Sequence, residues 1–276
     1  MTKGIRRCGV LTKKVTRITL ILGALALLSV IGLSGCGSKA LKIGASEVPH
    51  AEILEFAKPL LEKEGIEIEI IEFSDFVQPN LQLADKQLDA NFFQHIPYLE
   101  DMAEQRQLEI TWVAKIHIEP LGIYSEKISS LSELEDGAQV GIPNDATNGG
   151  RALMLLEKAG LLTLEEGTGT SATIGDIVGN PRKLQLRELD AAMLPRVLPD
   201  LDLAVINGNF ALQAGLSPTE DALFLEGGDS PYANVIAVRK EDKDNPSIQT
   251  LIKVLTSDEV RQFIDETYEG GVIPVF

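Results

Sequence analysis

Two long extended stretches, at residues 110–124 and 232–238, constrain the fold of this chain more than any other sequence feature. The first is longer than the five or six residues of a typical strand, and each stretch lies between regions where strands and helices alternate. Such a stretch can carry the chain from one folding unit to another. We therefore predict an α/β protein with two βα lobes that are joined by two crossing strands.

The alternation itself follows from hydrophobic periodicity. Residues 66–70 alternate apolar and acidic residues as a half-buried strand does, whereas residues 52–64 carry a single apolar helical stripe that ends at Gly65. Further strands are predicted at 41–45, 89–93, 139–142, 184–189 and 203–207, and further helices at 78–86, 97–107, 151–159, 191–198 and 257–268. We expect lobe 1 to contain residues 41–120 and 235–276, and lobe 2 to contain residues 121–234.

The N-terminus has the parts of a bacterial lipoprotein export signal. Six basic residues and no acidic residue precede an apolar run at 18–33, and Ser34-Gly35-Cys36 follows it. The run is shorter than the roughly twenty residues that span a bilayer, which argues against the alternative of an uncleaved membrane helix. We predict a signal peptide at 1–35, a lipidated Cys36, a tether at 36–40 and an extracytoplasmic protein anchored to the cell membrane.

Charge and cysteine content exclude several classes of protein. Removal of the six signal cations takes the formal charge from −16 to −22, and a surface of that sign repels nucleic acid and anionic headgroups. Cys8 departs with the signal and Cys36 is consumed by acylation, so no thiol remains for a disulfide, a metal cluster or a nucleophile. We expect the lipid alone to attach the protein to the membrane.

No motif indicates catalysis or a cofactor. The run at 167–172 matches the Gly-x-Gly-x-x-Ala dinucleotide fingerprint formally, but no convincing strand and helix flank it. The three histidines, His50, His95 and His117, lie too far apart in sequence to form a local metal-ligand pair. The sequence therefore predicts a protein that is not an enzyme, with no cofactor and no metal, although a site assembled from distant residues stays open.

Arg151 is the most informative charged residue. We expect it in the first turn of a helix that follows the capping and glycine residues at 144–150, where the free amides already create positive potential. A cation at that place needs an anion. The partner is either a local carboxylate such as Asp145 or the carboxylate of a ligand that the guanidinium grips with two hydrogen bonds.

Aromatic and amide side chains gather at the ends of predicted strands, where open α/β sheets bind ligands. Phe92 and Phe93 face opposite ways in a strand, so one is core and the other can line a cleft with His95 and Tyr98. Phe76 follows the preceding strand and is expected near the same cleft. The amides Asn207, Asn209 and Asn234 also end strands, and each can stabilise a turn or contact a ligand.

Five motifs behind the lipoprotein signal, taken together, resemble the methionine-binding lipoproteins of the NlpA family, which serve methionine ABC importers. The motifs lie at 75–80, 91–99, 145–153, 207–211 and 230–234, and the resemblance runs from Lys42 to the end of the chain. It implies a periplasmic-binding-protein fold of the type II kind, in which a ligand binds between two lobes and the loaded protein meets a permease and its ATPase.

The resemblance also implies roles for individual residues. Phe76, Phe93, His95 and Tyr98 would surround the side chain of methionine or a related amino acid, and Arg151 would bind its carboxylate. Asn234, with Asn207 or Asn209 or both, would fix the head group. Relatives often have tyrosine where this chain has Phe76 and Phe210. We expect a monomer.

Two other functions stay open at this stage. A transition-metal receptor would use His95, His117 and acids such as Glu119. An envelope hydrolase would need an activated nucleophile, which the sequence does not reveal. A purely structural lipoprotein would have no need of Arg151, a cation that waits for an anion.

Overall fold

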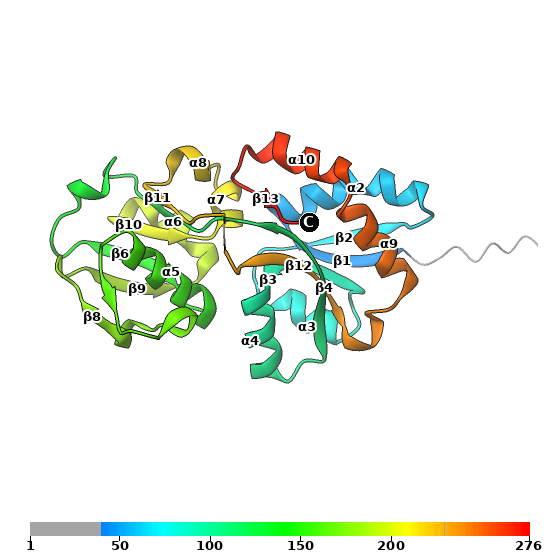
Figure 1. Cartoon of the computed structure of the whole chain (residues 1–276), viewed down its shortest axis with the longest axis horizontal. Coiled ribbons are helices and arrows are strands. Elements are labelled where there is room, and N and C mark those ends of the chain that lie inside the picture. The colour runs from blue at the N-terminus through cyan, green and yellow to red at the C-terminus, as the bar shows by residue number, and fades with distance from the viewer. Residues whose placement is uncertain (1–39, 229) are drawn as a thin grey trace, which may run out of the picture. The chain divides into compact units, whose positions relative to one another are not determined.

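In the computed structural model, which describes residues 40–228 and 230–276, the first and last parts of this range share one six-stranded sheet (Figure 1). Its strand order is β13-β4-β12-β3-β1-β2. The strands are β1 (Leu41–Ser46), β2 (Ile68–Phe73), β3 (Ala90–His95), β4 (Ile110–Ile118), β12 (Ala233–Arg239) and β13 (Ile273–Pro274). Strand β1 runs parallel to β2 and β3, whereas β12 runs antiparallel to β3 and β4.

Helices cover both faces of this sheet, and the residues of β12 alternate between the two. Ile236 and Val238 belong to one buried cluster and Val235 and Ala237 to the other, as the two-residue period of a strand requires. The first cluster packs against α2 (Glu52–Lys63), α9 (Pro246–Leu255) and α10 (Asp258–Tyr268), and the second against α3 (Gln78–Ala84) and α4 (Ile96–Arg106). A strand buried on both faces is accordingly almost wholly apolar.

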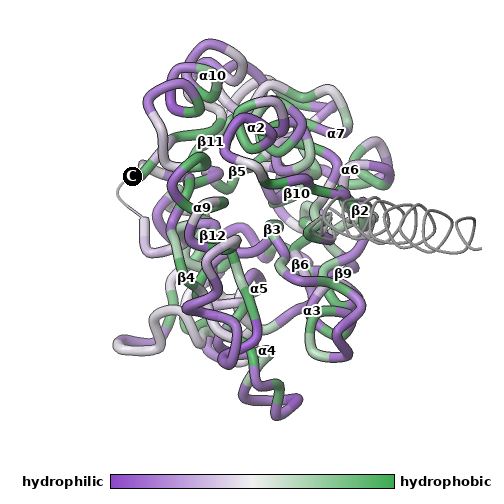
Figure 2. Tube along the Cα trace, turned by 90° about the vertical axis from the view of Figure 1, so that its right-hand side faces the viewer, coloured by the Kyte–Doolittle hydropathy of each residue, from purple (hydrophilic) through white to green (hydrophobic). Residues whose placement is uncertain are grey.

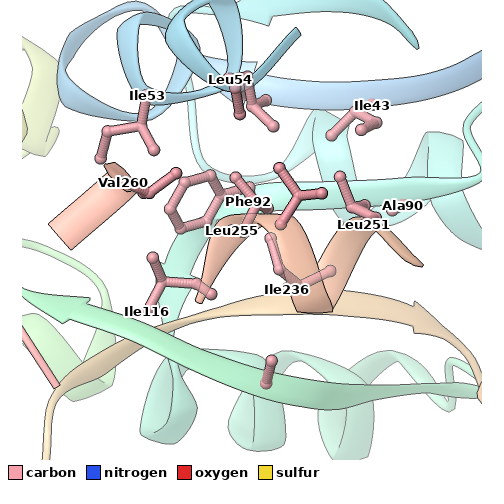
Figure 3. Close-up of a cluster of buried hydrophobic side chains, with 14 of the residues drawn as sticks. Ile43, Ile53, Leu54, Ala90, Phe92, Ile116, Ile236, Leu251, Leu255 and Val260 are labelled. Atoms are coloured by element: carbon pink, nitrogen blue, oxygen red, sulfur yellow. The ribbon is translucent and has the colours of Figure 1, made fainter. Parts of the chain in front are cut away.

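Phe92 lies in the middle of the first cluster. Figure 3 shows its ring between Leu54 of α2, Leu255 of α9 and Ile236 of β12. Helices α9 and α10 show both hydrophobic and hydrophilic residues in Figure 2, because only one side of each helix faces this core. The prediction that one of the two adjacent phenylalanines is core is confirmed, and Phe92 is that residue.

The middle of the chain forms a five-stranded sheet with the order β11-β5-β10-β6-β9. Its strands are β5 (Gly122–Tyr124), β6 (Gln139–Pro143), β9 (Gln185–Leu189), β10 (Leu203–Ile206) and β11 (Phe224–Leu225). Helix α5 (Ala146–Lys158) packs on one face, and α6 (Leu194–Val197) and α7 (Gly208–Gln213) pack on the other. The strands β7 (Thr163–Leu164) and β8 (Ile177–Gly179) form a separate pair, and α8 (Pro218–Asp221) follows α7.

The chain passes twice between the two sheets. It leaves the six-stranded sheet after Ile118, enters the five-stranded sheet at Gly122, and returns between Leu225 and Ala233. The long stretch at 110–124 therefore consists of two strands in two different sheets. The prediction of a two-lobed α/β fold with two crossings is confirmed, whereas the lobe boundaries at 120 and 234 stay predictions.

The signal peptide, Cys36 and all of the tether except Ala40 lie outside the described residues. Within the part of the chain that the structure describes, no helix combines the length and apolar character that a membrane span requires.

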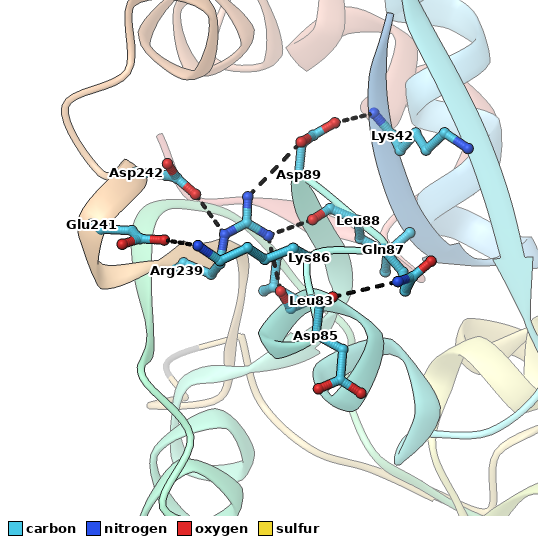
Figure 4. A network of polar contacts seen from close by, with 10 residues as sticks. All are labelled: Lys42, Leu83, Asp85, Lys86, Gln87, Leu88, Asp89, Arg239, Glu241 and Asp242. Carbon is cyan, nitrogen blue, oxygen red and sulfur yellow. Dashed lines mark hydrogen bonds and ion pairs between the residues drawn. The ribbon is translucent and has the colours of Figure 1, made fainter.

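Arg239, the last residue of β12, donates hydrogen bonds to the connection between α3 and β3 (Figure 4). Its Nη1 donates to the carbonyl oxygens of Leu83 and Leu88, and its Nε donates to Asp242 at 2.6 Å. Leu83 O, at the end of α3, also accepts from Lys86 N at 3.2 Å, and Leu88 O lies in the connection that follows, so the guanidinium gives both carbonyls a charged donor. Lys86 and Glu241 form an exposed ion pair in the same network, at 2.7 Å.

We expect Arg239→Ala to lower the free energy of unfolding by about 1–3 kcal/mol, because partly buried carbonyls lose their donor. Lys86→Ala is the matched control in the same network, and an exposed pair contributes at most about 1 kcal/mol. Urea unfolding of both variants measures the difference. Equal losses in the two variants would contradict this role of Arg239.

Candidate functional site

A cavity of about 20 Å³ lies between residues of the two sheets. This volume holds about one water molecule, so a larger ligand requires the lining side chains to move apart. The lining residues are Phe76, Phe93, Gln94, His95, Tyr98, Glu119, Asn148, Arg151, Asn207, Gly208, Asn209 and Asn234. Every residue that the sequence analysis assigned to the ligand site is in this set. That these residues bind a ligand stays a prediction.

Strand ends explain why these residues meet. Phe93 and His95 close β3, Asn207 directly follows β10, and Phe76 lies in the connection between β2 and α3. Asn234 is the second residue of β12, which runs antiparallel to β3, and it pairs with His95 there. The carboxyl ends of parallel strands and the start of an antiparallel neighbour share one edge of a sheet, so the side chains converge.

Helix α5 begins earlier than expected, and the prediction that Arg151 lies in its first turn is wrong. Asp145 caps the helix by accepting a hydrogen bond from Asn148 N at 2.9 Å, so residues 146–150 are helical and Arg151 lies in the second turn. The helix passes so close to the loop at 169–172 that a Cβ on Gly150 would lie 2.4 Å from Thr170 O. Glycine at this position permits the close approach.

The anion beside Arg151 is Glu226, which the sequence analysis did not identify. Arg151 Nε donates to Glu226 Oε1 at 3.1 Å, Nη2 donates to Glu226 Oε2, and Nη2 also donates to the Glu119 carbonyl oxygen at 2.9 Å. The guanidinium lies 4.2 Å from the ring centroid of Tyr232. Asp145, the local candidate for this anion, caps helix α5 instead. Arg151 is only 4% exposed, so the pairing is needed to stabilise its charge.

His95 connects the two lobes in a defined neutral form. Its Nε2 lies 3.0 Å from Asn148 Oδ1, an acceptor, and its Nδ1 accepts from Tyr98 N at 3.2 Å, so the ring carries its hydrogen on Nε2. Burial and then the charge of Arg151 lower the pKa of His95 to about 3. Asn148 Oδ1 also accepts from Asn207 Nδ2 at 2.8 Å, which extends the contact to β10.

One wall of the cavity is aromatic. The Phe76 ring centroid lies 5.9 Å from that of Phe93, 5.8 Å from that of Tyr98 and 4.8 Å from that of Phe210, on which it stacks. Tyr98 donates its hydroxyl to Phe76 O at 3.0 Å. Phe210 belongs to α7, so the stack joins the lobes, and the engaged Tyr98 hydroxyl leaves this wall mainly apolar.

Two polar side-chain atoms of the residues that line the cavity have no partner in the part of the chain that the structure describes. Asn207 Oδ1, an acceptor, and Asn209 Nδ2, a donor, are buried and have no hydrogen-bond partner among the described residues. A buried polar atom without a partner costs about 1–3 kcal/mol, which a ligand group can recover. The third amide, Asn234, is engaged, because its Oδ1 lies 3.2 Å from His50 Nε2.

Glu119 is one of four lining residues that the sequence analysis did not assign to the ligand site, with Gln94, Asn148 and Gly208. It lies in the first crossing, between β4 and β5, and burial raises the pKa of its carboxyl group, while His50, Arg151 and the backbone N–H of Asn209 lower it. A Cβ on Gly208 would lie 2.8 Å from Glu119 Cβ, so glycine allows α7 to approach the crossing.

His50 and His117 lie beside Glu119, and one ligand atom from each of the three residues lies within 4.8 Å of the other two, a separation at which they could hold a metal ion. His95 is not part of this cluster. The set proposed for a metal receptor, His95, His117 and Glu119, is therefore not brought together, and His50 stands where His95 was expected.

Comparison with known proteins identifies the relatives of this chain. The family model described as NlpA lipoprotein matches residues 41–276. A curated relative, the D-methionine-binding lipoprotein MetQ of Salmonella typhimurium, is 41% identical over 256 residues, which cover 90% of this chain and 94% of that relative. The resemblance that the sequence motifs indicated is confirmed.

Solved structures agree in fold. A nutrient binding protein from Burkholderia cenocepacia bound to methionine has a TM-score of 0.84 and 46% identity, and covers 86% of this chain and 100% of its own. A periplasmic substrate-binding protein of an ABC transporter from Coxiella burnetii has a TM-score of 0.82 and 45% identity, and covers 85% of this chain and 100% of its own. Both support the two-lobed fold derived above.

The buried histidines predict how stability depends on pH. Burial lowers the pKa of His50 to about 4 and that of both His95 and His117 to about 3, so the unfolded chain takes up protons below pH 6.5 that the folded protein does not. The three histidines therefore leave the free energy of unfolding unchanged above pH 6.5. Below that pH the free energy of unfolding falls by about 1.4 kcal/mol per pH unit for each histidine. Glu119 has the opposite effect on the free energy of unfolding, because its pKa is raised in the folded protein.

We expect His95→Gln to reduce by one the number of protons that the unfolded chain takes up and the folded protein does not. The free energy of unfolding of the variant should therefore fall less steeply as the pH drops. Urea unfolding between pH 7 and pH 5, compared for the wild type and the variant, measures the two slopes. Parallel slopes would show that His95 is not buried in its neutral form.

Proposed function

The chain belongs to the NlpA lipoprotein family, and we propose that it is the solute-binding protein of an ABC importer that captures methionine or a close analogue between its two lobes. In this function the protein binds and delivers a ligand, and no bond is made or broken. The permease and ATPase of the importer are its partners.

The observation that carries the proposal is the polarity of the cavity. A buried cation, a buried acid, an unpaired acceptor and an unpaired donor stand on one side, and an aromatic wall stands on the other. A zwitterionic head group with an apolar side chain satisfies both sides at once. Neither a wholly apolar ligand nor a multiply charged one does so.

The carboxylate of the ligand is placed at Arg151. Glu226 occupies Nε and Nη2 of the guanidinium, so Nη1 is the nitrogen left for the ligand, and Asn209 Nδ2 supplies a further donor. The ammonium group is placed between the Glu119 carboxylate and Asn207 Oδ1, which are both acceptors. Asn234 supports this end of the cavity through His50.

The thioether is placed against Phe76, Phe93 and Tyr98. Sulfur is polarisable, and each contact with an aromatic ring contributes about 0.3–1.5 kcal/mol beyond the burial of apolar area. The hydroxyl of Tyr98 is engaged by Phe76 O, so the rings present their faces and edges to the ligand. His95 separates this compartment from the head group as a neutral ring.

Attachment to the membrane follows from the N-terminus. We propose that the signal at 1–35 is removed, that Cys36 carries the lipid, and that the protein works outside the cytoplasm as a monomer. The lobes, with the expected boundaries at 120 and 234, close by rotation about the two crossings. A tethered receptor stays near its permease at high local concentration.

Calorimetric titration with L- and D-methionine tests this function directly. The protein is first denatured and refolded, because a carried-over ligand would mask binding. We expect heat and a raised melting temperature with at least one enantiomer. Absence of both effects with both enantiomers would refute a methionine receptor.

We expect Arg151→Ala to weaken methionine binding by about 1.5–3 kcal/mol, the contribution of hydrogen bonds to charged groups. Because this variant leaves Glu226 without its cation, the double variant Arg151→Ala/Glu226→Gln is measured beside it. Arg261→Ala is the control, since Arg261 lies against Phe276 away from the cavity, and its affinity should be unchanged. Wild-type affinity in both Arg151 variants would assign Arg151 to folding alone.

A further inference from the structure

Behind the head-group side of the cavity, two histidines lie close to one oxygen of Glu119. His117 Nε2 lies 2.8 Å and His50 Nε2 lies 3.2 Å from Glu119 Oε1. Both imidazoles are completely buried, and neither lines the cavity, whereas Glu119 does. The histidines therefore act on the cavity only through the carboxylate.

The contacts determine where each ring carries its hydrogen. His50 Nε2 faces two acceptors, Glu119 Oε1 and Asn234 Oδ1, so it is the protonated nitrogen, and His50 Nδ1 accepts from the Ser46 hydroxyl at 2.6 Å. His117 Nε2 likewise donates to Glu119 Oε1, and His117 Nδ1 has no partner in the described range. His117 thus donates a hydrogen bond to the carboxylate, whereas the single hydrogen of His50 Nε2 is donated to Asn234 Oδ1 and Glu119 Oε1 lies 3.2 Å from the same nitrogen.

The surroundings hold the two donors in place. The ring of Phe92 meets His50 edge-on at 4.6 Å and His117 at 5.3 Å between centroids, and the two imidazoles lie 4.9 Å apart. His50 also bridges the two crossings, because Glu119 belongs to the first and Asn234 lies in the strand that follows the second. The carboxylate is consequently fixed at the point where the lobes are joined.

These contacts disfavour a metal ion in the cluster. An ion bound by both histidines through Nε2 would require both nitrogens to lose their hydrogens. The hydrogen bond from His50 Nε2 to Asn234 Oδ1 would then be lost. A hydrogen-bonded carboxylate needs no such change.

We propose that His50 and His117 are positioning residues that hold the Glu119 carboxylate toward the ligand's ammonium group, so that recognition of an amino acid depends on two imidazoles that never touch it. The inference rests on the proposed function and deepens it. The N–H group of His117 favours the charged form of Glu119, whereas burial disfavours it. Arg151 and the backbone N–H of Asn209 act on the carboxylate from the cavity side, and Tyr268 faces it from α10.

The pH profile of methionine affinity tests the role. A protonated Glu119 attracts an ammonium group less, so affinity falls once the pH drops below the pKa of the carboxyl group. His117→Leu removes one donor and should move this fall to a higher pH by about one unit, so that affinity becomes up to about tenfold lower at pH values below the fall. His117→Gln keeps an N–H near the position of Nε2 and should restore the wild-type profile.

The paired variants His50→Leu and His50→Gln repeat the test if His117→Leu does not fold. In the Glu119→Gln background, the profile should be flat and His117→Leu should have no further effect. A lower affinity with an unshifted profile in the leucine variants would overturn the inference, because it indicates a purely structural role.

Two further outcomes are distinguishable. If the wild type binds no methionine, the proposed function fails rather than this inference alone. Native mass spectrometry with Zn²⁺ should show no adduct of the wild-type protein. A single zinc adduct that His50→Gln and His117→Gln both abolish would overturn the inference in favour of a metal site.

Discussion

The buried charges of Arg151 and Glu119 are the constraint on which the rest of this structure depends. Each is almost completely removed from water, and each would destabilise the fold if it stood alone. Glu226 stabilises the cation, and the imidazole of His117 donates a hydrogen bond to the acid. The cavity is therefore lined by a cation and an acid, the two kinds of group that a zwitterionic ligand needs.

The same residues join the lobes. Glu119 lies in the first crossing, Glu226 lies in the return segment, and Asn234 lies in the strand that follows it. His95 on one lobe bonds to Asn148 on the other, and Phe76 stacks on Phe210 across the same boundary. Recognition of the head group and the relative position of the lobes are consequently coupled, as a receptor that closes on its ligand requires.

Much of this could be predicted from the sequence. The convergence of Phe76, Phe93 and His95 followed from the rule that ligands bind at the carboxyl ends of strands, and the alternation of Phe92 and Phe93 separated core from cavity. His50 follows β1 at the same edge of the sheet, so the same rule could have found it. Glu226 could not be found, because its partner lies 75 residues away and no periodic pattern marks the loop.

The error at Arg151 has a physical cause. The two glycines before it suggested a loop, but helix α5 tolerates them because the loop at 169–172 packs closely against Gly150. Intrinsic propensity was overridden by a tertiary contact, which no local pattern reveals. The helix α9, which the sequence analysis missed, could have been found from local signals, because Asn245 caps it, Pro246 begins it and its buried residues recur at helical spacing.

The most direct test of the account is to locate the ligand's chalcogen atom. Crystals of the protein grown with selenomethionine as ligand would be measured at the selenium absorption edge, and the anomalous difference map calculated. We expect one peak among the rings of Phe76, Phe93 and Tyr98, with the head group toward Arg151 and Glu119. A peak beside Arg151, or no peak between the lobes, would contradict it.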